Sequence, residues 1–167
     1  MKTKLQCLVL AILSTLLFSP FAKGANKKTI PCESENHRAF DFWLGEWSVT
    51  SPNQKTPPSR SSITSSNDGC SIHERYSTAG GYTGNSINFY DKKNDKWHQT
   101  WIDNQGAPLY LDGEFINGSM VLSDGTNRIS WTLLDNQQVN QVWETTEDDG
   151  KTWKKIFDGF YRRIISK

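Results

Sequence analysis

The sequence predicts an all-β protein built as a single antiparallel β-barrel of about ten strands, preceded by a short N-terminal helix. Short segments rich in Trp, Tyr, Ile, Val and Thr recur along the chain, and such residues favour strands. Brief turn sequences separate these segments and leave no room for a helical crossover, so neighbouring strands must run antiparallel. That many strands in 167 residues should curl into a barrel or divide into two packed sheets.

The first 24 residues have the layout of a secretory signal peptide. Lys2 and Lys4 supply early positive charge, an apolar run follows over 8–18, and small residues surround Gly24, after which we expect cleavage. The apolar run is short for a membrane span; an uncleaved anchor is the alternative. We therefore expect a periplasmic or secreted protein, with a flexible lead-in over 25–33 and the barrel domain over 34–167.

The charge of the mature chain argues against several partners. Removing residues 1–24 takes away three lysines and no acids, so the net charge changes from +1 to −2. A nearly neutral domain with dispersed charge has no electrostatic footprint for nucleic acid or an anionic membrane. Nucleic acid and membranes are therefore not expected partners, and the sequence leaves the oligomeric state undefined. The predicted interior, described below, indicates a small molecule as the partner.

Two cysteines, Cys32 and Cys70, remain after cleavage. Export places them in an oxidising compartment, where two cysteines usually form a disulfide. Two free buried thiols are the alternative. Neither cysteine has a partner at the spacing of a zinc site, so we expect no metal.

A short helix over Glu35–Leu44 is expected to close one end of the barrel. Ser34 can cap its first turn, and Phe40, Trp43 and Leu44 share one face at helical spacing. Gly45 stands where such a helix would end.

All later elements are predicted strands separated by turns. The two-residue loop at 117–118 (Asn-Gly) is the firmest turn, because both residues tolerate positive φ. The segment Thr146–Trp153 resembles the Asp-box hairpin of sialidase-type propellers, but it occurs once, and turn chemistry alone explains Asp148. The expected turns are 67–69, 80–81, 92–95, 104–106, 117–118, 124–125, 135–136 and 148–150.

Glu74 is the most informative residue of the predicted interior. Side chains alternate between the two faces of a strand, and in the segment 70–76 Glu74 shares its face with Ile72 and Tyr76. A buried carboxylate is costly unless it is paired or hydrogen-bonded. Arg128 is a weaker candidate for its partner, because the apolar residues of the Arg128 strand lie on the opposite face.

Other polar side chains also share faces with aromatic residues. Gln99 lies between Trp97 and Trp101, and Gln141 precedes Trp143 on the same face. The segment 82–90 is ambiguous, since either its polar residues or Ile87 and Phe89 could point inward. Aromatic walls with a few amides, hydroxyls and one acid are typical of a small-molecule cavity, and a filled core is the alternative. The candidate ligand-binding residues are Glu74, Tyr76, Ser86, Asn88, Tyr90, Gln99, Trp101, Arg128, Gln141 and Trp143.

The three histidines do not indicate a metal, a haem or a catalytic triad. His37 falls on the predicted helix, whereas His73 and His98 fall on the outer faces of strands, so they do not converge. We expect no cofactor. A glycosidase-like carboxylate pair would need Asp103 beside Glu74, which is a weak possibility because Asp103 ends its strand.

Several segments resemble a bacterial secreted family of unknown function that is grouped with lipocalin-like, or calycin-like, barrels. They include 40–47 (FDFWLGEW), 68–74 (DGCSIHE), 97–103 (WHQTWID) and 141–161. The resemblance covers nearly all of the mature chain and implies a lipocalin-like barrel with a short N-terminal helix, but no activity. Ligand-binding barrels of the nitrobindin type are similar in architecture, although the haem-ligating His expected late in such a chain is missing here.

Three functions compete on these observations. The first is a periplasmic barrel that binds an amphipathic or aromatic small molecule, with Glu74, Gln99 and Gln141 orienting it. The second is a small isomerase, cyclase or hydrolase that uses Glu74 as general acid or base, because burial can raise the pKa of a carboxyl into the useful range. The third is an accessory protein whose interior is full.

Overall fold

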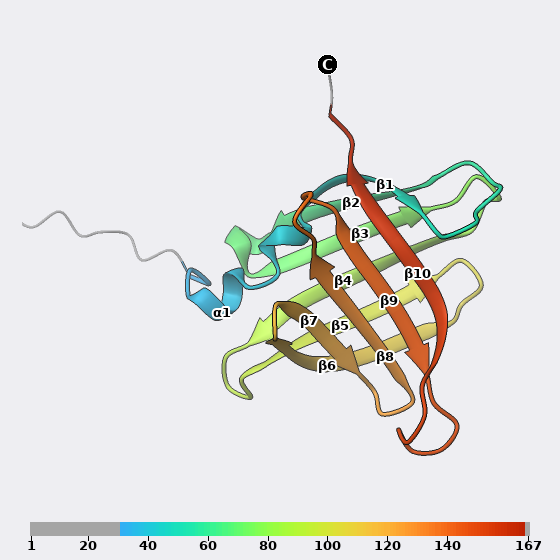
Figure 1. Cartoon of the computed structure of the whole chain (residues 1–167). Coiled ribbons are helices and arrows are strands. Elements are labelled where there is room, and N and C mark those ends of the chain that lie inside the picture. Colours follow the sequence, from blue (N-terminus) through green and yellow to red (C-terminus); the bar gives the residue numbers. More distant parts are fainter. Residues whose placement is uncertain (1–30, 166–167) are drawn as a thin grey trace, which may run out of the picture.

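The computed structural model describes residues 31–165, which form one closed barrel of ten antiparallel strands (Figure 1). The expected signal peptide and most of the expected lead-in, like residues 166–167, lie outside the described residues. Within 31–165, no helix is long and apolar enough to cross a membrane. The strands are β1 (Gly45–Thr50), β2 (Ser59–Ser66), β3 (Ser71–Ser77), β4 (Thr83–Asp91), β5 (Lys96–Asp103), β6 (Pro108–Ile116), β7 (Ser119–Ser123), β8 (Asn127–Leu133), β9 (Val139–Thr145) and β10 (Lys154–Arg163).

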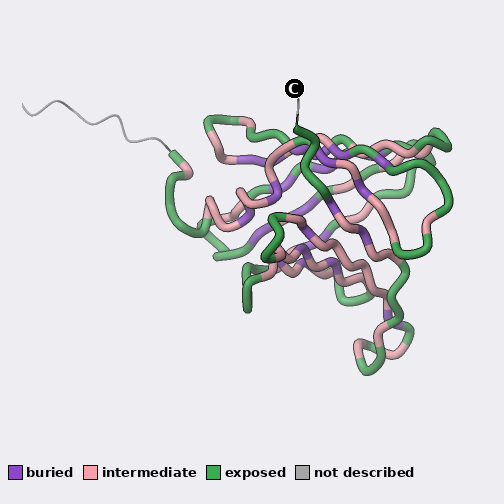
Figure 2. The backbone as a smooth tube through the Cα atoms, turned by 45° about the horizontal axis from the view of Figure 1, so that its top comes forward, coloured by how far each residue is buried: buried purple, intermediate pink, exposed green. Residues whose placement is uncertain are grey.

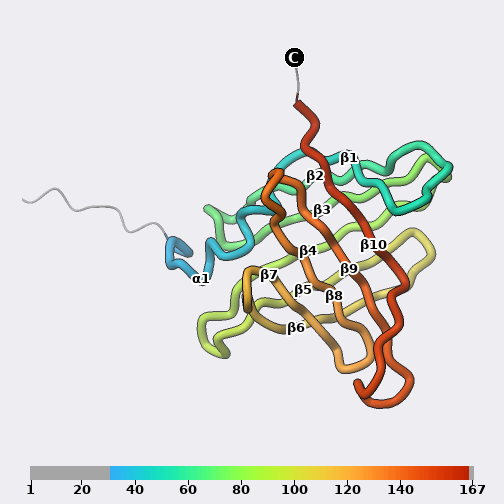
Figure 3. The backbone as a smooth tube through the Cα atoms, viewed as in Figure 1, coloured from blue at the N-terminus to red at the C-terminus, as the bar shows by residue number. Residues whose placement is uncertain are grey.

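Each strand pairs with its neighbour along the chain, and β1 pairs with β10 to close the barrel (Figure 3). The short turns allow only antiparallel neighbours, so the predicted connectivity and fold class are confirmed. The Asn117-Gly118 loop adopts the expected positive φ at both residues, 51° and 80°.

The predicted single helix is replaced by two shorter pieces. α1 spans Glu35–Arg38, and a 3-10 turn spans Asp41–Trp43. Ser34 caps α1 as expected by accepting a hydrogen bond from the His37 amide. The chain then kinks at Phe40, whose ψ of 5° departs from helical geometry. The kink allows both Phe40 and Trp43 to enter the end of the barrel, where each is fully buried.

Aromatic side chains fill the end of the barrel beneath α1. The Phe40 ring stacks on Trp43 with a centroid separation of 4.9 Å. It makes edge-to-face pairs with Trp97 and Trp131, at centroid separations of 5.6 and 5.2 Å. Burial alternates along the strands, as Figure 2 shows by its changes of colour along single strands. This end is therefore a dense core that closes the barrel.

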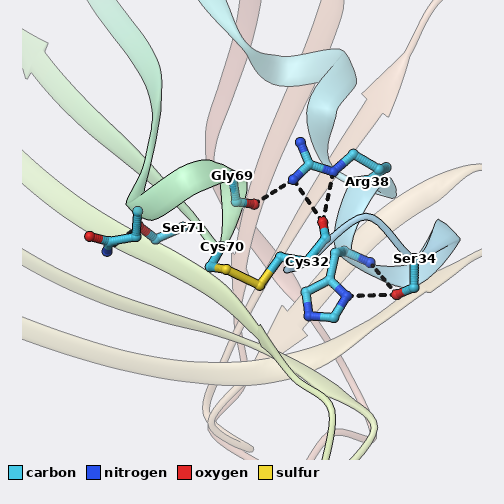
Figure 4. Close-up of a disulfide and its surroundings, with 8 residues drawn as sticks. Cys32, Ser34, Arg38, Gly69, Cys70 and Ser71 are labelled. Carbon is cyan, nitrogen blue, oxygen red and sulfur yellow. Dashed lines mark hydrogen bonds between the residues drawn. A yellow bond between two sulfur atoms is a disulfide. The ribbon is translucent and has the colours of Figure 1, made fainter. Parts of the chain in front are cut away.

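A disulfide joins Cys32 to Cys70, as predicted (Figure 4). It ties the segment before α1 to the 3-10 turn between β2 and β3. The Arg38 guanidinium donates to the backbone carbonyls of Cys32 and Gly69, which lie on the two sides of this link. The bond and the guanidinium together hold the N-terminal segment against the closed end.

The Thr146–Trp153 segment is a structural hairpin between β9 and β10. Asp148 Oδ1 accepts hydrogen bonds from the Thr146 hydroxyl and the Thr152 amide, each at 2.8 Å. The Trp153 indole donates to the Gly150 carbonyl at 3.1 Å. These turn bonds account for the motif without a catalytic role.

Candidate functional site

A cavity of about 350 Å³ lies in the half of the barrel opposite α1. Its lining comes from the ends of strands that point away from the closed end and from the loop between β3 and β4, which contributes Thr78 and Tyr82. Figure 1 shows α1 at one end of the barrel and this loop at the other. The protein is therefore a cup, with a filled base and a hollow open half.

Glu74 on β3 lies in the floor of the cup and is only 5% exposed. The sequence places it there because it shares the inward face of β3 with Ile72 and Tyr76. The register sets it beside Ile63 of β2 and Ser86 of β4. Ser61 donates to Oε1 at 2.8 Å, and Ser86 donates to Oε2 at 3.3 Å.

The backbone carbonyl of Ile72 determines which groups donate and which accept in the hydrogen bonds that link Asn88, Ser86 and Glu74. The Ile72 carbonyl can only accept, so the Asn88 amide nitrogen, 3.1 Å away, must donate to it. The same nitrogen donates to Ser86 Oγ at 3.0 Å, which leaves the Ser86 hydroxyl hydrogen for Glu74. The network therefore delivers donors to the carboxyl group, as suits its ionised form.

The orientation of Asn88 also fixes that of Gln99 on β5. Asn88 Oδ1 accepts from Gln99 Nε2 at 2.8 Å. Gln99 Oε1 must then turn away from Asn88, and it receives no hydrogen bond from the described residues. Gln99 lines the cavity, so it offers an acceptor there.

Gln141 on β9 is held by Tyr161 on β10. The Tyr161 hydroxyl donates to Gln141 Oε1, so the Gln141 amide nitrogen is left as a donor that bonds to no other described residue. Both residues line the cavity. The floor thus presents a carboxyl group, an acceptor from Gln99 and a donor from Gln141.

Four large aromatic side chains form much of the wall, namely Tyr76, Trp101, Trp143 and Phe157. Two of them lie over glycines. A Cβ on Gly84 would be 2.0 Å from the Trp101 ring, and a Cβ on Gly159 would be 2.5 Å from the Phe157 ring. The missing side chains therefore allow both rings to lie flat against the strands, which keeps the space inside the barrel open.

Burial dominates the electrostatics of the cavity. It raises the pKa of Glu74 from 4.5 to about 7, against the opposing effect of the hydrogen bonds from Ser61 and Ser86. Burial, with the nearby Glu74 carboxyl as a further cause, also raises the pKa of Tyr161 well above its ordinary value. Tyr82, at the rim, has its pKa raised to about 12 by burial and by its hydrogen bond to Asp103.

The structure brings six of the ten predicted site residues together around the cavity: Glu74, Tyr76, Gln99, Trp101, Gln141 and Trp143. Ser86 and Asn88 point inward, while Ile87 is 46% exposed, which resolves the ambiguity of β4. These two residues do not line the cavity but support Glu74 and Gln99 from behind. The predicted interior is thus hollow in its open half.

Tyr90 and Arg128 lie away from the cavity, contrary to the prediction. Tyr90 is at the closed end, where its hydroxyl bonds to Asp95 and Asn36. Arg128 is on the outer face of β8, where it pairs with Glu144 at 2.8 Å and stacks over Trp153. Side chains alternate along β8, so Ile129 points into the barrel and its neighbour Arg128 points outward, away from Glu74.

Sequence reasoning missed seven lining residues. Tyr161 follows the inward alternation of β10 and could have been found by the same criterion as Glu74. Ile156 and Phe157 are consecutive, yet both line the cavity, because the register of β10 shifts between Lys155 and Phe157. Strict alternation cannot place two neighbours on one face. The seven are Thr78, Tyr82, Leu109, Ile129, Ile156, Phe157 and Tyr161.

Comparison of the chain with protein-family models and with curated protein sequences yields no match. The resemblance of 40–47 and the other segments to a secreted barrel family therefore stays a prediction.

Proposed function

We propose that this protein binds a small, largely apolar organic molecule in the open half of its barrel, in a periplasmic or secreted setting. The observation that carries the proposal is the cavity itself, which joins aromatic walls to a floor with a few oriented polar groups. Ligand sites share this composition and have volumes of about 300–1,000 Å³. The disulfide supports export, because such bonds persist in oxidising compartments.

The polar floor would orient the ligand, and the walls would supply most of the affinity. Burial of apolar surface contributes roughly 25 cal/mol per Å², and flat aromatic walls favour flat ligands. Gln99 and Gln141 keep one acceptor and one donor free for the ligand, since their other amide atoms bond to Asn88 and Tyr161. A bound molecule would therefore direct its polar end to the floor and its apolar body to the opening.

Isothermal titration calorimetry with three naphthalene probes tests the proposal. The probes are naphthalenemethylamine, naphthalenemethanol and naphthoate, which share a flat body but differ in charge. At least one should bind to the wild type at a single site. Leu109→Trp, which fills the cavity wall, should abolish this binding. The matched control is Tyr110→Trp on the next residue, which is 65% exposed on the outer face and should bind normally. The proposal is contradicted if none of the three probes binds saturably to the wild type. It is also contradicted if Leu109→Trp binds a probe as tightly as Tyr110→Trp does.

Proton transfer on the bound molecule is a second candidate function, favoured by the pKa of Glu74 near 7. A group that titrates near neutral pH can act as general base or acid. Bound tetralone should then exchange its α-hydrogens with solvent deuterium, as followed by proton NMR. The exchange should be faster with the wild type than with Glu74→Gln. Equal rates in both proteins would contradict a catalytic role.

A further inference from the structure

The charge distribution around the cavity is one-sided. Among the described residues that line it, Glu74 is the only acid and none is Lys, Arg or His. Arg128, which could have neutralised Glu74, pairs with Glu144 outside the barrel. The other titratable side chains that face Glu74 are Tyr76 on the same strand and Tyr161 on β10, and tyrosine cannot supply a positive charge.

The hydrogen-bond network leaves Glu74 ready for a cation. Ser61 and Ser86 each donate one hydrogen bond to the carboxyl oxygens, and a carboxylate has about four acceptor positions. Gln99 Oε1 adds another free acceptor, by the orientation that Ile72 and Asn88 impose. The floor is therefore richer in acceptors than in donors, and it holds a buried acid without a counter-charge.

The walls suit the same kind of ligand. The register places Trp101 beside Ser86, which itself lies beside Glu74, and Tyr76 is the next inward residue of β3. Tyr76 and Trp101 meet edge to face with ring centroids 6.4 Å apart. Aromatic faces attract cations that approach within about 6 Å. A positive group at Glu74 would thus lie next to rings that also favour it.

We propose that the cavity selects organic monocations, with a protonated amine against the Glu74 carboxylate and a flat apolar body between Tyr76, Trp101 and Trp143. The proposal rests on the binding function above and specifies its ligand class. A neutral ligand would leave the buried acid unpaired, and an anionic ligand would be repelled by Glu74 with no cation to compensate. The cation supplies the counter-charge that the described lining lacks.

The three naphthalene probes separate the charge preference from binding itself. In calorimetric titrations of the wild type at about pH 8, the amine should bind at least about tenfold more tightly than naphthalenemethanol, because a charge-assisted hydrogen bond outweighs a neutral one. Naphthoate should bind most weakly. If the alcohol or the acid binds as tightly as the amine, the inference is overturned while the proposed function stands. If no probe binds, the proposed function fails as well.

The pH dependence and one variant tie the preference to Glu74. The carboxyl must lose its proton to pair with the amine, which stays protonated throughout, and the pKa of Glu74 is about 7. Amine affinity should therefore fall about tenfold from about pH 8 to about pH 6, while alcohol affinity falls little. Glu74→Gln should remove this pH dependence and lower the amine affinity about tenfold or more. If Glu74→Gln keeps both the pH dependence and the amine affinity of the wild type, the inference is overturned. If the variant fails to fold, the wild-type measurements still decide the question.

Discussion

Glu74 couples the stability of the folded protein to pH. The folded state keeps the proton of this carboxyl up to about pH 7, whereas the ordinary pKa is 4.5. Between these values the folded state binds more protons than the unfolded state, so stability falls as the pH rises through the window. The contribution of the protonated Glu74 to stability is fully present below pH 4.5, the pKa in the unfolded state, and is lost above about pH 7, the pKa in the folded state.

A comparison of wild type and Glu74→Gln in urea unfolding measures this coupling. From about pH 5 to about pH 8 the wild type should lose roughly 2–3 kcal/mol of unfolding free energy from Glu74. The glutamine variant cannot ionise at this position, so it should not lose this free energy. The difference in unfolding free energy between variant and wild type should therefore shift in favour of the variant by that amount from about pH 5 to about pH 8. Parallel pH profiles for the two proteins would show that Glu74 is not a buried titrating group.

Arg128 is a residue whose loss should matter little. Its side chain is 36% exposed where it pairs with Glu144, and such partly solvated pairs contribute about 0–1 kcal/mol. Arg128→Ala should lower the unfolding free energy by no more than roughly 1–2 kcal/mol, since the contact with Trp153 is also lost. Its affinity for the naphthalene probes should equal that of the wild type. A loss of probe affinity in Arg128→Ala would show that Arg128 contributes to the ligand site after all.

At the scale of elements, alternation along the strands predicted six of the thirteen residues that line the cavity, including its polar floor. Loop positions between β3 and β4 and the irregular strand β10 account for part of the rest. Glu74, Gln99 and Gln141 were found because each lies among apolar residues at a spacing of two. The bulge in β10 brings Ile156 to the cavity beside Phe157, which shares the regular inward face with Tyr161, so Ile156 could not be predicted from that spacing. The kink at Phe40 divides the predicted helix for a comparable reason, because the packing of two aromatic rings in the barrel end outweighs helical periodicity.

Gly84 on β4 should control the shape of the cavity. A methyl group at this position would lie 2.0 Å from the Trp101 ring, so Gly84→Ala must move the indole into the cavity. The unfolding free energy should fall by about 1–3 kcal/mol, as is usual for overpacking. Near-ultraviolet circular dichroism should change with it, and probe binding should weaken. An unaltered spectrum with full binding would show that Trp101 does not rest on Gly84.

At the scale of the whole molecule, the two ends of the barrel have different tasks. The closed end is packed with Phe40, Trp43, Trp97 and Trp131, which stabilise the fold. The open end leaves its aromatic side chains unpacked around a cavity. The sequence predicted the barrel and its short helix, since short turns and strand composition are local properties. It could not predict which half is hollow, because that depends on how side chains from non-adjacent strands meet.

The disulfide links the N-terminal segment to the barrel over a separation of 38 residues. The chain-entropy account of such a loop gives about 4 kcal/mol of stabilisation. A double substitution, Cys32→Ser with Cys70→Ser, should lower the unfolding free energy by an amount of this order in chemical denaturation. Probe binding should persist wherever the variant is folded, because the bond lies at the closed end. Loss of binding by the folded variant would contradict the separation of the two ends.

The most direct test of a ligand cavity floored by Glu74 is an NMR titration of the Glu74 carboxyl carbon, with and without saturating naphthalenemethylamine. The free protein should show a pKa of about 7, and the bound amine should lower it, since a cation favours the ionised carboxylate. An ordinary carboxyl pKa in the free protein that the amine leaves unchanged would contradict the account.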